Sequence, residues 1–438
     1  MSSNFNKSIL SSVAFAALLA GVTQAHAGGF AIREQSAAGQ GLSFAGAAAG
    51  GAGLGSAFWN PATLTDNAGW QSAWSVTGII PYAKINPTGG TLGALPGAEI
   101  GLNALVPGST TSYQVNSNLW VGLNVGAPFG LATKSLPMWA GQTFALTSEA
   151  RSTNITPMIA YKISDMISVA VGVQAMQFSA RFTSALAAGV ATPPTLILNG
   201  KNWGYGFTAG VTIKPAAGTE IGIGYRSQVR EQIKGNNTIS IALAPVLPAG
   251  SYGIQSTIKL PDTLTIGLKQ KINDQWTVLA GYEWSGWSVF GTFPITCTAA
   301  GAICPPPAAL DFRYRNGWFA SAGAEYKWNK DLTMRAGLAY EHSPISDAVR
   351  GLRLPDNDRI WASIGANYVI SEKTTLDVGY THIFAARSTP VSITSVVNPA
   401  FTTAAATLTA DVKSRVDIIS VGLRYRFDQP TKAVVAKY

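Results

Sequence analysis

The sequence predicts an all-β membrane protein, a 14-stranded antiparallel transmembrane β-barrel with an N-terminal helical hatch, or plug, in its lumen. Three observations support this prediction. Hydrophobic residues make up 47% of the chain and charged residues only 12%, about half the share of a typical soluble domain. No apolar run beyond the N-terminal segment reaches the length of a transmembrane helix. Short polar turns alternate with long loops, as in outer-membrane barrels.

Residues 1–27 have the features of a secretory signal peptide. Lys7 supplies a positive start, residues 9–22 are an apolar stretch of 14, and Ala25-His26-Ala27 is an A-x-A cleavage site. The apolar stretch is too short to span a bilayer. The alternative is a buried N-terminal helix. We therefore expect the mature chain to begin at Gly28.

Residues 28–68 form the predicted hatch. They are too rich in Gly and Ala for regular strands and too few for an independent domain. Within them, Asn60-Pro61-Ala62 predicts a helix start, because Asn is a good N-cap and Pro is favoured at the first helical position. A barrel of fourteen strands has room inside that its own side chains do not fill. This segment is therefore expected to lie in the lumen.

Residues 69–427 form the predicted barrel, and residues 428–438 form a C-terminal tail. The short turns lie at 116–118, 164–165, 215–219, 273–274, 329–331 and 371–373. The long loops lie around 86–108, 130–146, 184–200, 236–252, 293–310, 344–357 and 389–408. Six turns and seven loops require fourteen strands, which leaves both chain ends on the periplasmic side. The last strand shows the alternation best, because Ile419 and Val421 take one face and Ser420 the other. An array of soluble β-sandwiches is the alternative.

The predicted third strand is interrupted at Gly126, Pro128 and Gly130. Pro128 cannot donate a hydrogen bond to the sheet, and the two glycines weaken the strand around it. A break of this kind would open the barrel wall sideways into the bilayer. The alternative is that Pro128 only ends a strand at a loop.

Other patterns exclude several classes of function. Cys297 and Cys304 are the two cysteines of the chain, and an oxidising periplasm favours a disulfide between them over the alternative of two free thiols. No histidine or second cysteine pair lies near them in the sequence, which argues against a metal site. His342 and His382 are the histidines that remain after signal cleavage, and neither accompanies a recognised nucleophile motif. We therefore expect no catalytic residues, no cofactor and no metal, with a lipase as the alternative. The net charge of +9 is scattered, so nucleic acid is not an expected partner.

Several longer segments carry a family resemblance. They are "FWNPATL" in the hatch, "NVGAPFGLATK" at 124–134, "NWGYGFTAG" at 202–210, "GYRSQVREQIKGN" at 224–236 and "LPDNDRIWASIGANY" at 354–368. Together with their order along the chain, these segments resemble the FadL family of outer-membrane transporters of long-chain fatty acids and other hydrophobic compounds. The resemblance covers essentially the whole mature chain. It implies a hatch that contains the Asn-Pro-Ala motif, a kinked third strand with a lateral opening, and passive uptake of hydrophobic molecules.

The resemblance also implies contacts with the ligand. Phe30 is the third mature residue, an aromatic after two small residues, and such a residue reaches the binding pocket in the family. Arg181 and Arg315 match family positions that face a fatty-acid carboxylate, which arginine binds well through paired hydrogen bonds. The alternatives are ordinary plug packing for Phe30 and ion pairs within the lumen for the two arginines.

A plugged barrel with an apolar pocket suits a hydrophobic solute, since burying an alkyl chain is worth about 0.8 kcal/mol per methylene. We expect a monomer in the bacterial outer membrane, in contact with its lipid and lipopolysaccharide, that takes up long-chain fatty acids or related compounds by diffusion. The alternatives are uptake of aromatic hydrocarbons or alkanes within the same family, a small-solute porin, and a structural or adhesive barrel.

Overall fold

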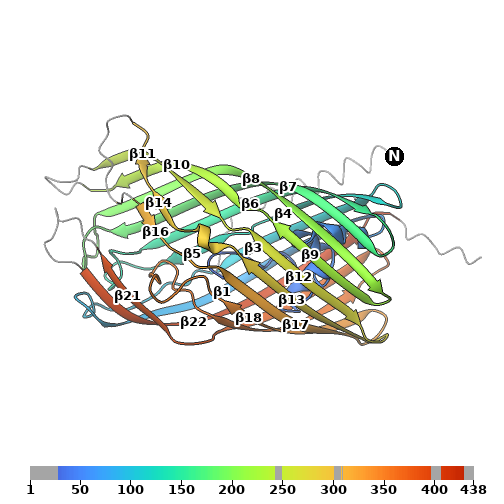
Figure 1. The fold of residues 1–438 in the computed structure, drawn as a ribbon. Coiled ribbons are helices and arrows are strands. Elements are labelled where there is room, and N and C mark those ends of the chain that lie inside the picture. Colours follow the sequence, from blue (N-terminus) through green and yellow to red (C-terminus); the bar gives the residue numbers. More distant parts are fainter. Residues whose placement is uncertain (1–27, 242–248, 300–306, 308, 396–405, 429–438) are drawn as a thin grey trace, which may run out of the picture.

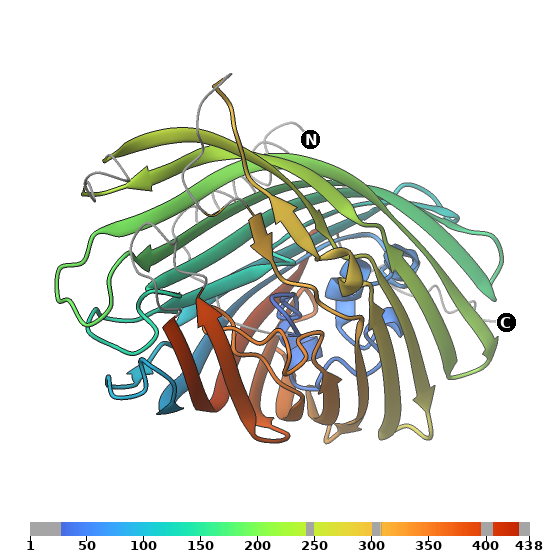
Figure 2. The ribbon, with the colours of Figure 1, turned by 60° about the vertical axis from the view of Figure 1, so that its left-hand side comes forward.

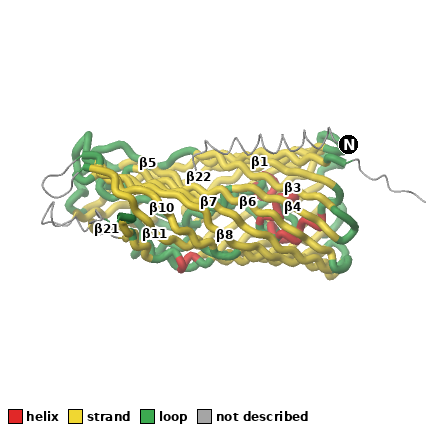
Figure 3. Tube along the Cα trace, turned by 90° about the horizontal axis from the view of Figure 1, so that it is seen from above, coloured by secondary structure: helices red, strands yellow, loops and turns green. Residues whose placement is uncertain are grey.

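The computed structural model describes residues 28–241, 249–299, 307, 309–395 and 406–428. Within these residues the wall strands form a closed antiparallel barrel around the N-terminal helices (Figures 1 and 3). The seam joins β1 (Trp70–Gly89) to β22 (Ala406–Arg426), paired from Gln71 opposite Arg426 to Gly89 opposite Thr409, with a register shift between Pro87 and Gly89. The predicted 14-stranded barrel with a hatch in its lumen is confirmed.

Fourteen wall strands are counted in the described residues, and four of them are interrupted, so that each of these carries two labels. The interrupted ones are β4 (Leu119–Gly126) with β5 (Gly130–Lys134), β9 (Thr219–Arg226) with β10 (Val229–Ile239), β11 (Gly250–Leu260) with β12 (Thr263–Lys271), and β20 (Thr374–Ala385) with β21 (Thr389–Ser395). The others are β1, β3 (Ala104–Gln114), β6 (Thr147–Lys162), β7 (Ile167–Ala185), β8 (Thr195–Ala216), β13 (Trp276–Ser285), β17 (Gly317–Lys327), β18 (Leu332–His342), β19 (Arg359–Val369) and β22. A short strand, β2 (Ala98–Glu99), pairs with the end of β1.

The six predicted short turns all separate neighbouring wall strands, and the long loops gather at the other end of the barrel (Figure 1). The alternation in the last strand is also confirmed. Ile419 and Val421 are 51% and 50% exposed on the outer face. Ser420 is buried, and its hydroxyl lies 2.7 Å from that of Thr77 on β1. An apolar outer face of this kind is what lipid requires of a barrel.

The hatch consists of four short helices inside the barrel. They are α2 (Ala37–Gln40), η2 (Ala47–Ala49), η3 (Gly53–Phe58) and η4 (Pro61–Asp66). Where the hatch backbone touches the wall, the wall residue is often glycine. A Cβ atom at Gly222 would overlap the carbonyl of Ala48, and one at Gly224 would overlap that of Trp59. These glycines let the hatch backbone approach the wall closely. No helix of the described chain is long and apolar enough to cross a membrane.

The predicted interruption of the third strand is present between β4 and β5. β3 pairs with β4 from Ser109 onwards, whereas β5 has its ladder with β6. The hatch supplies substitute partners at the gap, since Ile32 N donates to Pro128 O and Gly130 N donates to Phe30 O, each at 2.8 Å. Part of the segment expected to be a loop at 130–146 is therefore strand β5, because β6 continues beyond the break and gives it a partner.

Three further interruptions, between β9 and β10, between β11 and β12 and between β20 and β21, were not predicted. The gap between β9 and β10 lies beside the gap between β11 and β12. On one side of the two gaps Arg226 of β9 pairs with Thr263 of β12, and on the other side Val229 of β10 pairs with Leu260 of β11. β13 ends at Ser285, so the upper part of β11 pairs instead with β15 (Thr296–Cys297). The following segment contains η5 (Trp287–Val289) and a two-stranded ribbon of β14 (Thr292–Pro294) and β16 (Ala309–Asp311), seen in Figure 2.

Candidate ligand-binding site

An apolar cavity of about 270 Å³ lies at the loop end of the barrel. Most of its lining comes from the inner faces of β7, β8, β10 and β11, from the β14–β16 ribbon, and from the loop 343–358 between β18 and β19. The hatch and the strands β5, β6 and β21 contribute further residues. On β7 the lining residues are Phe178, Ala180 and Phe182, which alternate along the strand and so share its inner face. The cavity can bury an alkyl or aromatic group and exclude water from it.

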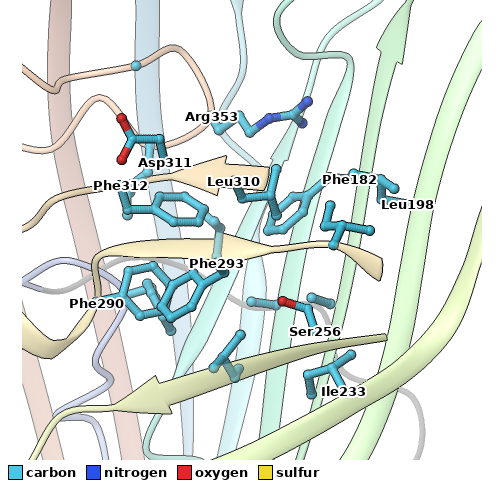
Figure 4. Close-up of a pocket in the computed structure, with 18 of the residues that line it drawn as sticks. Phe182, Leu198, Ile233, Ser256, Phe290, Phe293, Leu310, Asp311, Phe312 and Arg353 are labelled. Carbon is cyan, nitrogen blue, oxygen red and sulfur yellow. The ribbon is translucent and has the colours of Figure 1, made fainter. Parts of the chain in front are cut away.

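The ribbon forms an aromatic wall of this cavity, as Figure 4 shows. The ring of Phe290 has its centroid 4.7 Å from that of Phe293 and 4.7 Å from that of Phe312. Sequence reasoning missed these residues, because the segment was interpreted as a loop. The signal was present, since a segment so rich in aromatic residues has apolar surface to bury.

Phe30 of the hatch lies on the floor of the cavity, where the resemblance places a ligand contact. It is 4% exposed, and its ring centroid is 4.7 Å from Trp287 and 5.0 Å from Phe290. Gly29 before it has a φ of +66°, and a Cβ atom there would lie 3.0 Å from the Trp287 ring. The Gly-Phe pair therefore turns the aromatic ring into the cavity. That Phe30 contacts a ligand stays a prediction.

Arg353, in the loop 343–358, is a cation that lines this apolar cavity. Its Nη1 donates to the hydroxyl of Ser148 at 3.3 Å and to the carbonyls of Thr147 and Thr183 at 3.4 and 3.3 Å. Its guanidinium carbon lies 5.2 Å from the ring centroid of Phe182. No carboxylate of the described chain lies within 4.0 Å of it. Burial lowers the pKa of Arg353 to about 10, so that it stays charged at neutral pH.

The loop that carries Arg353 is held by a second arginine. Arg350 is 1% exposed; its Nε donates to Asp356 O at 2.7 Å and its Nη1 to Pro390 O at 2.8 Å. Thr133 of β5 donates to the carbonyl of Arg353 at 3.0 Å. These hydrogen bonds fold the loop into the lumen instead of into solvent. Sequence reasoning missed Arg353, because strand periodicity carries no information about how a long loop folds.

The structure does not bring Arg181 and Arg315 to the cavity. Arg181 is exposed on the outer face of β7, between Ala180 and Phe182 of the inner face. Arg315 is exposed after the ribbon, where its Nε donates to Ser343 O at 3.3 Å. Neither arginine faces the cavity. That Arg181 and Arg315 contact a carboxylate therefore stays a prediction, and their positions place both side chains outside the cavity that Arg353 lines.

The Asn-Pro-Ala motif forms the expected cap and also ties the hatch to the wall. Asn60 Oδ1 accepts a hydrogen bond from Ala62 N at 3.0 Å, and Pro61 is the first residue of η4, a 3₁₀ helix. Asn60 Nδ2 donates to Ala48 O at 2.8 Å and to Val211 O of β8 at 2.9 Å. One side chain therefore caps a helix, joins two hatch segments and contacts the barrel.

Gly126, Pro128 and Gly130 lie at the interruption between β4 and β5. Phe129 among them has its ring 5.8 Å from that of Phe30. Phe129 and Trp287 also line a second cavity, of about 40 Å³, together with Pro128. Phe30 thus stands between the large apolar cavity and a smaller one that reaches the break in the wall.

The remaining predictions concern cysteines and metals. Cys297 lies in β15, whereas Cys304 lies outside the described residues, so the disulfide stays a prediction. Among the residues that the structure describes, no group of three or more His, Cys, Asp or Glu side chains is arranged to hold a metal ion.

Comparison with known proteins gives a consistent picture. Residues 18–427 match the family described as outer membrane protein transport protein (OMPP1/FadL/TodX). The long-chain fatty acid transport protein of Salmonella typhi is 26% identical over 388 residues, covering 82% of this chain and 88% of that protein.

Solved structures show the same fold. A FadL homologue from Pseudomonas aeruginosa superimposes with a TM-score of 0.79 at 22% identity, covering 92% of this chain and all of that one. The toluene transporter TbuX of Ralstonia pickettii gives a TM-score of 0.65 at 17% identity, covering 89% of this chain and 98% of that one.

Proposed function

This chain belongs to the OMPP1/FadL/TodX family of outer membrane transport proteins, and on that premise we propose that it takes up long-chain fatty acids through the apolar cavity. The fatty acid enters from the loop end, displaces Phe30 and leaves sideways at the break between β4 and β5. Transport is passive. The protein works as a monomer in contact with outer-membrane lipid and lipopolysaccharide.

The observation that carries the choice of substrate is Arg353. A hydrocarbon such as toluene can offer this cation only a weak cation–π contact, whereas a partly buried guanidinium that has no carboxylate partner among the described residues costs free energy. A fatty-acid carboxylate would pair with it through charge-assisted hydrogen bonds. The alkyl chain would then lie along Phe178, Phe182 and the ribbon, where each buried methylene contributes about 0.8 kcal/mol.

The proposed exit is supported by the contacts around Phe30. The break in the wall is bridged by hydrogen bonds from the hatch segment 30–32, and the small cavity reaches Pro128. Movement of Phe30 would therefore join the large cavity to the small one. A solute leaving there would pass from apolar side chains into lipid without crossing water.

A second candidate substrate is a monoaromatic hydrocarbon. The cluster of Phe290, Phe293 and Phe312 favours it, since aromatic rings stack on one another in edge-to-face and offset arrangements. A relative of similar fold is a toluene transporter by name. The two candidates differ in what they require of Arg353.

The test replaces Arg353 with glutamine. Arg353→Gln removes the charge but keeps a polar side chain. It is expected to weaken oleate binding about 10- to 100-fold, because hydrogen bonds to a charged group contribute a free energy of that size. Binding of oleyl alcohol and toluene is expected to change little. The measurement is equilibrium binding to purified protein, combined with uptake by cells that express each variant.

Arg181→Gln is the matched control, because Arg181 faces away from the cavity, and it is expected to bind oleate as the wild type does. Equal oleate binding by wild type and Arg353→Gln would refute the proposed head-group contact. Uptake of toluene without uptake of oleate would favour the second candidate.

A further inference from the structure

The first residues of the hatch end against two buried carboxylates. Gly28 N lies 2.8 Å from Glu341 Oε1, and Gly29 N lies 3.0 Å from Asp356 Oδ2. Glu341 is 1% exposed and Asp356 is 3% exposed. Glu341 stands near the end of β18, and Asp356 belongs to the loop that carries Arg353. The hatch therefore meets both the wall and the cavity loop at its first two residues.

The two glycines make this approach possible. A Cβ atom at Gly28 would overlap the Glu341 carboxylate, and Gly29 has a backbone conformation that favours glycine. The nitrogen of residue 28 is thereby brought directly onto Glu341. A residue with a side chain at this position would hold it farther away.

The surrounding group of charges contains more acids than bases. Arg33 pairs with Glu283 at 2.6 Å and with Glu341 at 3.5 Å. Arg359 pairs with Asp356, and lies 3.9 Å from Glu341. Glu34 is buried among them, and within the described chain its carboxylate has no hydrogen-bond partner.

The three carboxylates of Glu283, Glu341 and Asp356 thus share the two guanidinium groups of Arg33 and Arg359. Buried charge is stable only when it is compensated, so one more positive charge next to Glu341 would be favourable.

We propose that this charge is the α-ammonium of Gly28, formed when the signal peptide is cleaved after Ala27. The ammonium ion-pairs with Glu341, and the Gly29 N–H donates to Asp356. These two contacts fix the chain on either side of the turn that leads to Phe30. Glu341 and Asp356 are thus positioning residues for the aromatic floor of the cavity. The importance of that position rests on the proposed function, and the ammonium rests on the predicted cleavage site.

The proposal is tested by the reactivity of the terminal amine. Pairing with a buried carboxylate raises the pKa of an α-ammonium, and each unit of that rise lowers the reactive free-amine fraction about tenfold. The folded protein in detergent is treated with the N-hydroxysuccinimide ester of acetic acid near neutral pH. Mass spectrometry then measures acetylation of the tryptic peptide 28–33. We expect acetylation to be about tenfold or more slower in the folded than in the heat-unfolded protein.

Two variants and one control sharpen the test. Glu341→Gln is expected to restore rapid acetylation in the folded protein. An alanine inserted between Ala27 and Gly28 moves the ammonium but keeps every side chain, and it is expected to do the same even if Glu341→Gln does not fold. Glu325→Gln is the matched control, since Glu325 is a lumenal carboxylate paired with Arg335 at 2.8 Å, and it is expected to leave the amine protected.

The outcomes separate this proposal from the proposed function. A mature chain that begins at another residue, or equal acetylation in the folded and unfolded protein, would overturn the ammonium contact. Unchanged protection in a folded Glu341→Gln protein would do so as well. A protected amine without oleate uptake would keep the contact and refute the proposed function. Oleate uptake by a protein whose terminal amine is reactive would refute the ammonium contact and support the proposed function.

Discussion

Glu34 is a hatch carboxyl group that is 0% exposed. Burial raises its pKa from the ordinary 4.5 to about 7, and the negative charge of Glu341 adds to the rise, whereas Arg33 and Arg359 oppose it. The folded protein therefore holds a proton on Glu34 more tightly than the unfolded chain does. The stabilisation by this proton is fully present below pH 4.5 and is lost as the pH rises through 7.

Glu34→Gln is expected to remove this pH dependence, because glutamine stays neutral. Relative to the wild type, the variant should gain on the order of 2 kcal/mol in the free energy of unfolding between pH 5 and pH 8. The measurement is the midpoint of heat unfolding at both pH values, followed by the gel mobility of folded and unfolded barrel. Glu372→Gln, in an exposed turn, is the control. A difference that is independent of pH would contradict the prediction.

At the scale of single residues, the sequence contained more information about Arg181 than about Arg353. Val169, Val171 and Val173 form the outer face of β7, and the two-residue period carries that face to Arg181. A stricter use of the alternation would have placed Arg181 outside. Nothing comparable exists for Arg353, whose position depends on hydrogen bonds that its loop makes to strands distant in sequence.

At the scale of elements, the interrupted third strand has a testable role. Pro128→Val, combined with Gly126→Val, is expected to lower oleate uptake severalfold, because β-branched side chains favour a continuous strand and fill the opening. Uptake by whole cells measures the effect, and gel mobility shows whether the barrel is folded.

Pro157→Val is the control for that experiment. Pro157 is exposed within the ladder between β6 and β4, where it faces Leu123, and its replacement is expected to leave uptake unchanged. Full uptake by a folded variant at positions 126 and 128 would show that the exit lies elsewhere.

The other interruptions show where element prediction stopped. The turns were predictable because polar residues and glycine are common in them. The break at Pro128 was predictable because proline cannot donate a backbone hydrogen bond to a neighbouring strand. Ser227 and Gln228 include neither glycine nor proline. Their gap exists because β9 and β10 face a strand that is itself divided at Pro261, so the cause lies in a neighbouring strand.

At the scale of the whole molecule, the hatch and the wall fit closely at glycines. Gly224→Val would push the side chain into Trp59 O, so it is expected to displace the hatch and raise ion conductance in planar bilayers severalfold. Gly291→Val is the control, because no atom lies within 4 Å of a Cβ atom there. Unchanged conductance in a folded Gly224→Val protein would mean that the hatch does not block the lumen.

The hatch segment that bridges the broken wall has a further consequence, for solubility and assembly. An unpaired strand edge invites pairing with another chain. At the gap, the backbone of residues 30–32 is hydrogen-bonded to the backbone of residues 128–130. Farther along β5, Gly101 forms an isolated β-bridge with Thr133. The hatch segment 30–32 therefore also covers the strand edge at 128–130, to which a strand of a neighbouring barrel could otherwise pair. A chain that lost residues 28–32 would therefore expose the unpaired backbone of 128–130 to a neighbouring chain.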